Sequence, residues 1–579
     1  MRLKSKLCSS LVKVMPTREP DGKNYCSGSV LQGEVFSFQL AYCTDYNWIP
    51  ICIDIQSELK PYITCRSVEL VPAEYPGFLF DDDYVDTRPG LYPDRLQELP
   101  KEGLKSIVNQ WRSLWFKAAI PEDVPAGKYK ITIRLSSPKH PGYKGPAPRR
   151  KMCFTLEVLP LKLPPQTLLH TNWLHPDCLA TYYRQEVFSQ AHWETLENFF
   201  RCASAHGINL LLTPIFTPPL DTRVGGERPT VQLVKVTKEN GRYSFDFSLL
   251  TKWIKLAQRC GITHFEMAHL FTQWGAEYTP KIIATVDGVE KRIFGWDVRA
   301  DSPEYAEFLG AFLPKLADYF RKADMVDKVY FHTSDEPNKK HRRSYAAAAK
   351  LLKKHIGEFH TIDALSSVEF YKSKLVSLPV PIEDRVEEFI EAGVPEVWIY
   401  YCCGPMQIYC NRFIAMTSSR NRIFGTLLYY YNVKGFLHWG FNFYYSRYSM
   451  KAIDPYRCTD ADAAFPAGDA FVVYPGKDGI PEVSLRLEVF YEALQDQRAL
   501  QLLEKFMPRK RIIKMLDGFV PEGKMGMENY PRGEENVLKL RKKVNSLLKK
   551  YADGRFLGGA FSNPSHSRFA SKKESGIDG

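Results

Sequence analysis

The feature that most constrains the fold is an alternation of apolar runs and amphipathic segments over about 300 residues, starting near residue 161. The apolar runs have the length of strands and span residues 208–212, 263–267, 329–331, 360–362 and 397–400. Amphipathic segments, such as 302–322 and 341–355, lie between them. Because strands that alternate with helices form parallel sheets, and no glycine-rich phosphate motif follows any of them, the pattern predicts a TIM-like (β/α)8 barrel.

The first 160 residues have a different periodicity. Apolar and polar residues alternate with a period of two in the runs 35–41, 115–120, 129–135 and 154–158, and turn signals such as Pro125-Ala126-Gly127-Lys128 separate them. This pattern predicts a β-sandwich. We therefore expect a multidomain α and β protein, with an accessory β-sandwich over residues 1–160, a barrel over 161–500 and a basic helical extension over 501–579.

The charge distribution favours a soluble protein without nucleic acid as a partner. The net charge is +12, and the segment from Gln501 onward has 17 Lys and Arg residues against nine Asp and Glu. Runs such as Arg509-Lys510-Arg511 and Arg541-Lys542-Lys543 stand among apolar residues at helical spacing, which predicts solvated helix faces. No nucleic-acid-binding module accompanies the charge. After Phe556 the chain is rich in Gly, Ser and Lys, and we expect it to fray.

Targeting and cysteine patterns favour a cytoplasmic location. No run of about 18 apolar residues is present, so no membrane span is expected. The run Leu7-Cys8-Ser9-Ser10-Leu11-Val12 ends at Lys13, which is too short for the apolar core of a signal peptide. The 13 cysteines are irregularly spaced without any Cys-x-x-Cys, so reduced thiols are expected and neither a metal site nor a cofactor is predicted.

The run His332-Thr333-Ser334-Asp335-Glu336-Pro337 places two adjacent acids at the end of an apolar run. Neighbouring side chains of a strand point to opposite faces, so both acids share one pocket only if the second lies on the loop. Pro337 fits, because it favours an extended conformation in the residue before it. At the C-terminal end of a barrel strand, a pair such as Asp335 and Glu336 indicates acid–base work on a glycosidic bond. The alternative is that Asp335 caps the next helix and Glu336 is merely exposed.

Polar and aromatic clusters follow several of the predicted strands. Their candidate substrate-binding residues are His269, Gln273, Trp274, Asp363, Tyr400, Tyr401, Arg412, Trp439 and Asn442. Strand ends of a barrel converge on one face, where aromatic rings suit the apolar face of a pyranose and polar groups hold its hydroxyls. We therefore expect an oligosaccharide or glycoconjugate substrate. For any single aromatic residue, a place in the core is the alternative.

These residues carry a resemblance to a known family. The matching stretches are Gln273-Trp274-Gly275-Ala276, Phe294-Gly295-Trp296, Ser334-Asp335-Glu336-Pro337, Ile362-Asp363-Ala364-Leu365-Ser366, Asn411-Arg412-Phe413-Ile414-Ala415-Met416, Phe436-Leu437-His438-Trp439-Gly440 and Gly468-Asp469-Ala470-Phe471-Val472-Val473-Tyr474-Pro475-Gly476. The segment from His269 to about Gln495 resembles the catalytic domain of glycoside hydrolase family 123, formerly a domain of unknown function. The upstream sandwich, with Pro89-Gly90-Leu91-Tyr92-Pro93-Asp94, fits the accessory domain of that family.

The resemblance implies a β-N-acetylgalactosaminidase that hydrolyses terminal β-linked N-acetylhexosamine with retention. In that mechanism the sugar's own 2-acetamido oxygen attacks the anomeric carbon. Carried over by position, Asp335 orients the acetamido group and stabilises the oxazolinium-like intermediate. Glu336 protonates the leaving oxygen and then activates water, and no metal is needed.

Two alternatives stay open at this stage. One is a glycosidase of other specificity, in which a separate carboxylate such as Glu266 or Asp363 acts as the nucleophile with Glu336. The other is a noncatalytic carbohydrate-binding barrel protein. The adjacent acid pair weighs against the second alternative, because a binding protein does not need it.

Overall fold

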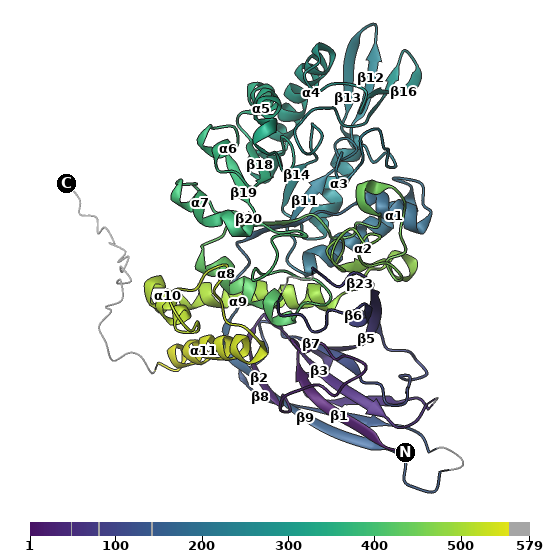
Figure 1. The fold of residues 1–579 in the computed structure, drawn as a ribbon, viewed down its shortest axis with the longest axis vertical. Helices are drawn as coiled ribbons and strands as arrows, with labels where there is room; N and C mark the ends of the chain where they lie inside the picture. Colours follow the sequence, from purple (N-terminus) through teal and green to yellow (C-terminus); the bar gives the residue numbers. More distant parts are fainter. Residues whose placement is uncertain (48, 79–81, 140–142, 555–579) are drawn as a thin grey trace, which may run out of the picture.

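The computed structural model describes all residues except 48, 79–81, 140–142 and 555–579. The N-terminal part consists of two sheets that face each other at the lower end of the molecule in Figure 1. The first is antiparallel and contains, in spatial order, β1 (Leu3–Ser9), β3 (Val35–Thr44), β7 (Arg112–Ala119), β5 (Ile63–Ala73) and β6 (Gly90–Glu98). The second contains β2 (Ser27–Gln32), β9 (Arg149–Lys162), β8 (Gly127–Ser136) and β4 (Cys52–Gln56).

The core between these two sheets is built from the inward residues of the alternating runs. Phe38 on β3 stacks on Phe116 of β7, with ring centroids 4.9 Å apart, and on Phe154 of β9 at 4.2 Å. All three rings are fully buried, so they join both sheets into one apolar layer. The strands expected from the period of two are confirmed here.

Eight parallel strands form a nearly closed barrel beyond the sandwich. They are β10 (Leu169–Asn172), β11 (Leu210–Thr213), β14 (His264–Met267), β17 (Val329–Phe331), β18 (His360–Leu365), β19 (Leu378–Pro381), β20 (Trp398–Tyr400) and β21 (Gly435–His438). Neighbours in space follow the order of the chain, and β21 returns to pair with β10. A single bridge between Ile382 and Tyr400 joins the two edge strands.

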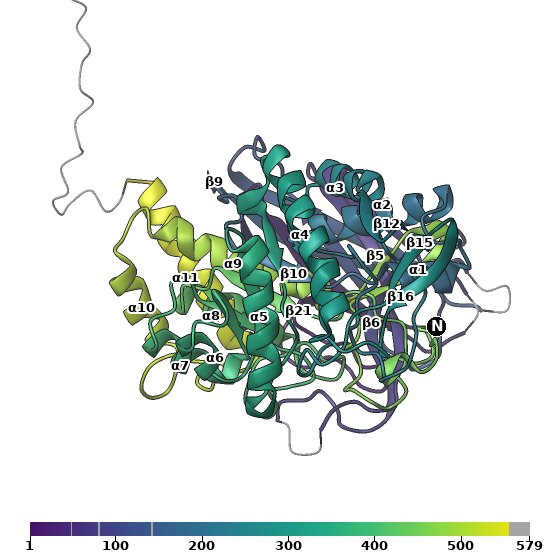
Figure 2. The same cartoon turned by 90° about the horizontal axis from the view of Figure 1, so that it is seen from above.

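Helices cover the outside of the barrel, and Figure 2 shows α4 and α5 side by side in the view from above. They are α1 (Pro176–Tyr183), α2 (Gln190–Ala205), α3 (Ser248–Arg259), α4 (Pro303–Lys322), α5 (Arg342–Ile356), α6 (Glu369–Lys372), α7 (Val386–Glu391), α8 (Ser418–Tyr430) and α9 (Leu485–Leu503). Ser302 caps α4 by accepting a hydrogen bond from the Tyr305 backbone N–H. The predicted segments 302–322 and 341–355 are therefore helices, as expected.

Two further sheets were not predicted. Strands β12 (Lys235–Glu239), β13 (Arg242–Asp246), β15 (Ile282–Val286) and β16 (Val289–Phe294) form a four-stranded sheet that the loops after β11 and β14 contribute. Strands β22 (Val473–Tyr474) and β23 (Glu482–Val483) form a small hairpin before α9. Short 3-10 helices span Lys60–Tyr62, Val326–Lys328, Lys339–His341, Glu383–Arg385, Arg447–Ser449 and Lys477–Gly479.

The C-terminal region is helical, with α10 (Arg509–Asp517) and α11 (Glu534–Ala552) beside α9 (Figure 1). The solvated-face prediction is wrong for Arg541, which is buried and donates hydrogen bonds to Glu34 at 2.7 and 2.8 Å and to Asp496 at 2.5 Å. Arg541 thus ties α11 to the start of the sandwich and to α9. The expected fraying after Phe556 lies outside the described residues.

The described helices include none that combines the length and the apolar character required to cross a bilayer.

Candidate functional site

The loop after β17 brings Asp335 and Glu336, here called the acidic pair, to the C-terminal end of the barrel strands. The strand ends at Phe331, and Glu336 takes a left-handed φ of 44°, a conformation that non-glycine residues seldom adopt outside constrained sites. The Glu336 backbone N–H donates to Ala364 at 3.1 Å. Both acids therefore lie on the loop. Asp335 caps no helix, since Asn338 caps the 3-10 helix that follows.

Asp335 lies almost out of contact with solvent, with 7% of its surface exposed. Its Oδ2 accepts a hydrogen bond of 3.0 Å from the Gln273 side-chain amide. Its carbonyl oxygen accepts one of 2.9 Å from the Trp274 backbone N–H. Burial, followed by the charge of Glu336, raises the pKa of Asp335 well above its usual range, with the His332 charge opposing.

The Glu336 carboxylate accepts a hydrogen bond from a side chain at the end of another barrel strand. The Tyr400 hydroxyl, at the end of β20, donates a hydrogen bond of 2.8 Å to Glu336 Oε1. Burial, together with the Glu336 charge, raises the pKa of Tyr400 well above its usual range. The hydroxyl therefore stays protonated and acts as a donor that orients Glu336.

The acidic pair opens into a cavity of about 110 Å³. Seven predicted site residues line it, namely Gln273, Trp274, Asp335, Glu336, Tyr400, Tyr401 and Trp439. Several other lining residues were not predicted, among them Trp173, His175, Asp221 and Phe465. Six Trp, Tyr and Phe side chains therefore line the cavity together with three acids, which is a surface suited to a sugar ring.

Trp274 separates this cavity from a second one. The second cavity holds about 400 Å³ and is lined by Trp274, Tyr278, Trp296 and Tyr448, with Arg223, Glu277 and His341 among its polar residues. The Trp274 ring is 39% exposed and lies edge-to-face with Tyr448, at 5.7 Å between centroids. Gln273 and Trp274 line both cavities, so the second cavity lies next to the first.

Trp439 and Asp469 form a fixed pair on the opposite wall. The Trp439 indole N–H donates to Asp469 Oδ2 at 3.0 Å, and Asp469 is fully buried. Burial raises the pKa of Asp469 to about 7, although the bond from Trp439 lowers it. Asp469 lies in the stretch 468–476 that carried the family resemblance, so that stretch was the signal for this residue.

Four predicted site residues do not line the cavity. Asp363 is fully buried and accepts hydrogen bonds from the Thr333 backbone N–H at 3.0 and 3.2 Å, and one from the Tyr345 hydroxyl. Asn442 exchanges hydrogen bonds of 2.8 and 3.0 Å with the backbone of His175, which itself lines the cavity. Asp363 and Asn442 therefore stabilise backbone segments next to the cavity.

Arg412 is also buried outside the cavity. Its guanidinium donates a long hydrogen bond of 3.4 Å to the Gly440 carbonyl oxygen. Burial lowers the pKa of Arg412 to about 10. Gly440 follows Trp439 directly, so Arg412 supports the wall from behind.

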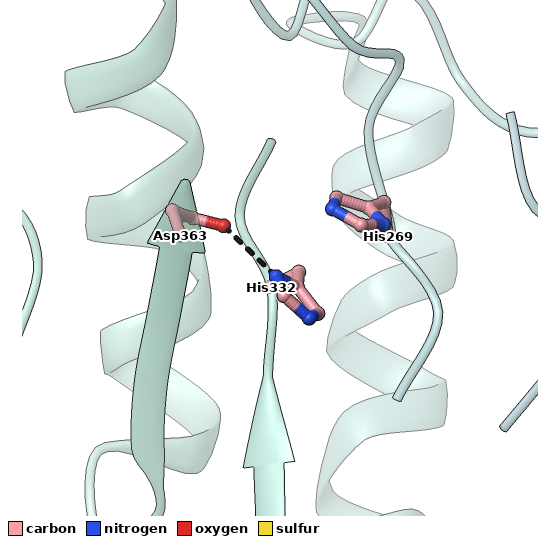
Figure 3. A group of neighbouring side chains, drawn as sticks. All are labelled: His269, His332 and Asp363. Atoms are coloured by element: carbon pink, nitrogen blue, oxygen red, sulfur yellow. Dashed lines mark ion pairs between the residues drawn. The ribbon is translucent and has the colours of Figure 1, made fainter. Parts of the chain in front are cut away.

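His332 lies at the centre of a buried charge network beneath the cavity (Figure 3). Its Nε2 is 2.8 Å from Glu266 Oε2, and its Nδ1 is 3.3 Å from Asp363 Oδ1. Burial lowers the pKa of His332, but hydrogen bonds and charge from these two acids outweigh it and raise the pKa to about 9. His332 is thus an imidazolium shared by two carboxylates. Trp173 lies edge-on to this ring at 5.9 Å and lines the cavity, so it packs between the His332 ring and the cavity space.

His269 stacks on His332, with ring centroids 4.2 Å apart and planes at 21°. His269, His332 and Asp363 each offer one atom within 4.8 Å of the others, which is close enough to consider a metal ion. A histidine binds a metal through a nitrogen lone pair in the plane of its ring, and two nearly parallel stacked rings cannot both aim at one ion. Because each nitrogen of His332 also lies beside a carboxylate, the arrangement fits a charge network better than a metal centre.

Comparison with known proteins gives a consistent picture. The model of the glycoside hydrolase 123 catalytic domain matches residues 173–503. A solved family 123 glycoside hydrolase from Clostridium perfringens, studied for glycolipid glycan hydrolysis, is similar with a TM-score of 0.70. The two chains are 16% identical, and the alignment covers 96% of this chain and 98% of that one.

Other solved structures are more distant. A Bifidobacterium dentium β-glucuronidase in complex with coumarin-3-O-glucuronide has a TM-score of 0.31 at 8% identity, covering 80% of this chain and 62% of that one. A structure described as a glycoside hydrolase has a TM-score of 0.31 at 12% identity, covering 60% and 71%. No curated protein matches the chain.

Proposed function

The chain belongs to glycoside hydrolase family 123, and from that premise we propose that it removes terminal β-linked N-acetylhexosamine, in particular N-acetylgalactosamine, from a glycan. The proposed reaction retains the anomeric configuration and uses the 2-acetamido oxygen of the substrate as the nucleophile. The observation that carries the proposal is the acidic pair, in which each acid has its own partner on a different strand end.

The two partners support different roles for the two acids. Asp335, held by Gln273, is the residue that accepts the acetamido N–H and stabilises the oxazolinium charge as the ring forms. An N–H donated to Asp335 favours its ionised form, the form that this role requires. Glu336, oriented by Tyr400, then protonates the leaving oxygen and later activates the water that opens the ring.

The walls of the cavity support a sugar substrate. Trp173, Tyr401 and Trp439 present apolar surface that suits the C–H face of a pyranose and the acetyl methyl group. The second cavity beyond Trp274 gives the rest of the glycan a place to lie. The neighbouring aromatic rings there suit further sugar units in the same way.

The alternative nucleophiles are poorly placed for that chemistry. Glu266 is fully buried, accepts a hydrogen bond from the Thr171 hydroxyl and pairs with His332. Asp363 is held by Thr333, Tyr345 and His332. Neither lines the cavity, so substrate assistance is the better-supported mechanism.

We also infer the arrangement of units around this site. The strand order and the outer helices support a (β/α)8 barrel, and residues 161–500 form the catalytic unit. Residues 1–160 form the accessory sandwich, and residues 501–579 form the extension.

The decisive experiment compares Asp335→Asn with Glu336→Gln on aryl and alkyl N-acetylgalactosaminides. Asp335→Asn removes the charge that stabilises the oxazolinium, so turnover falls for both substrates. Glu336→Gln removes the general acid, so alkyl turnover falls about 10²–10⁴-fold while the aryl cleavage step, which needs little protonation, survives far better. Equal aryl-to-alkyl ratios in the two variants would contradict these roles.

A second measurement separates the mechanisms. A thiazoline analogue of the oxazoline intermediate inhibits the enzyme if the acetamido group takes part, because a separate carboxylate nucleophile forms no such ring. Hydrolysis that the thiazoline leaves untouched would favour the separate nucleophile. Wild-type turnover in either variant would end the proposal.

A further inference from the structure

Asp221 is a third acid on the wall of the cavity. It lies in the loop after β11, which ends at Thr213, and it takes a left-handed φ of 38°. Aspartate tolerates this conformation better than most residues do, because its side chain bonds to nearby backbone. The loop after the second strand of the barrel therefore delivers a carboxylate to the same place as the loops after β14 and β17.

Hydrogen bonds join Asp221 to the acidic pair on one side and to residues 448–449 on the other. Its backbone N–H donates to the side-chain oxygen of Gln273, whose amide nitrogen donates to Asp335. Its Oδ2 accepts a hydrogen bond of 3.0 Å from the Tyr448 backbone N–H. The Ser449 hydroxyl donates to its carbonyl oxygen at 2.7 Å. These bonds fix the position of the carboxylate relative to the acidic pair and to the segment that carries Tyr448.

The other carboxylate oxygen, Oδ1, accepts no hydrogen bond from the described residues. No ion pair reaches Asp221 within the described part of the chain either. Arg228 is nearby but is held by Asp177 through two hydrogen bonds of 2.8 Å. A partly buried acceptor that faces a cavity without a protein partner is costly unless water or a ligand donates to it.

We propose that Asp221 is a specificity-determining residue that accepts a hydrogen bond from a ring hydroxyl of the sugar through Oδ1. This inference rests on the proposed function, because it takes the cavity to be the place where the terminal sugar lies. Hydroxyls are the donors that a sugar offers, and a charged acceptor strengthens such a bond. A site built to bind a particular hydroxyl rejects an analogue that lacks it, because the buried acceptor is then left unpaired.

The test pairs one variant with a series of ligands. Asp221→Asn keeps the left-handed backbone and one oxygen for the Tyr448 N–H, but it presents an NH2 group where Oδ1 stood. Calorimetry measures the binding of N-acetylgalactosamine and of its 3-deoxy, 4-deoxy and 6-deoxy forms to both proteins. We expect the variant to bind the parent sugar about 10- to 100-fold more weakly. For one deoxy form, and only that one, the two proteins should bind equally.

Asp287→Asn is the matched control. Asp287 is an exposed aspartate with a φ of 48° whose Oδ1 accepts a backbone hydrogen bond from Asn240, and it lies in the turn between β15 and β16. The Asp287→Asn variant makes the same change of charge at a residue with a similar left-handed backbone, and Asp287 does not line the cavity. The control should bind all four sugars as the wild type does.

The outcomes separate this inference from the proposed function. An equal loss for every sugar would overturn the inference, because Asp221 would then act through Gln273 on Asp335. Unchanged binding in Asp221→Asn would overturn it as well, and so would failure of every sugar to bind. Loss of activity on aryl glycosides as complete as in Asp335→Asn would make Asp221 part of the chemistry and would also overturn it. Hydroxyl-specific binding without hydrolysis of aryl N-acetylgalactosaminide would support the inference and refute the proposed function.

Discussion

Replacement of Arg541 by Met tests how the C-terminal helix is joined to the rest of the molecule. Arg541 is buried, and its guanidinium bonds Glu34 of the sandwich, Asp496 of α9 and Asn545 of its own helix. Asp496 keeps two hydrogen bonds from Arg422, at 2.8 and 3.1 Å, when Arg541 is removed. Among the described residues, the Glu34 carboxylate then keeps only the 2.8 Å bond from the Leu31 backbone N–H. The variant therefore leaves one buried carboxylate without a cation.

Breaking a buried pair in this way costs about 3–5 kcal/mol, because the remaining charge is uncompensated. The loss depends on pH. Burial raises the pKa of Glu34, and the Arg541 charge is the main opposing effect, so the Arg541→Met variant raises that pKa further. A carboxyl whose pKa is raised by folding binds more protons when folded, so the free energy of unfolding falls as pH rises above about 4. The deficit of the variant should therefore be smaller at pH 5 than at pH 8.

Urea unfolding followed by tryptophan fluorescence gives the free energies, and hydrogen–deuterium exchange over α11 locates the change. Lys542→Met is the matched control, since Lys542 is exposed and adjacent. The double variant Arg541→Met with Glu34→Gln removes both charges and should recover most of the loss. A deficit under about 1 kcal/mol, or no recovery in the double variant, would refute the reasoning.

Two further predictions concern the site. Trp439→Phe keeps an aromatic wall but removes the donor to Asp469, and Trp439→Ala removes the wall. We expect sugar affinity, measured by calorimetry, to fall more in the Ala variant than in the Phe variant. The urea midpoint of the Ala variant should change little. Unfolding of the Ala variant would assign Trp439 to the core instead. Prolonged chelation with EDTA should leave activity on an aryl glycoside unchanged, because His332 is already paired with Glu266 and Asp363. Activity that EDTA abolishes and a divalent ion restores would show that a metal takes part.

The barrel could be predicted where its strands are apolar and not where they are polar or contain proline. β17 and β20 are short apolar runs and were expected. β10 reads Leu-His-Thr-Asn, and β19 contains Pro379 and Pro381, so neither has the composition of a strand. Proline has no N–H to donate, and β19 lies at the seam that a single bridge closes. The two prolines that make β19 hard to predict from the sequence therefore also account for the single bridge that closes the barrel.

The site was predictable where a residue closely follows an apolar run. Asp335, Glu336 and Gln273 satisfy that condition and meet at the cavity. Asp221 does not, because a loop containing Pro218 and Pro219 separates it from β11. Asp363 follows the predicted run 360–362 and lies within β18, yet its carboxylate accepts hydrogen bonds from the Thr333 backbone and does not line the cavity. A position just after a strand therefore identifies candidate site residues. Only the direction of the side chain shows whether a candidate faces the cavity or supports the surrounding backbone.

Arg541 shows that the surroundings of a charged residue are also difficult to predict from the sequence. The apolar residues Val537, Leu540, Val544 and Leu548 recur at helical spacing and mark the buried stripe of α11. Arg541 lies four residues after Val537 and three before Val544, so the spacing alone places it on that stripe, whereas Lys542 points away. A charge on a buried stripe requires a partner, and that partner belongs to strands and helices distant in the chain. The prediction of a solvated face treated the run 541–543 as one surface and missed the position of Arg541 on the stripe. The fold is needed to show that Arg541 is buried and that Glu34 is its partner.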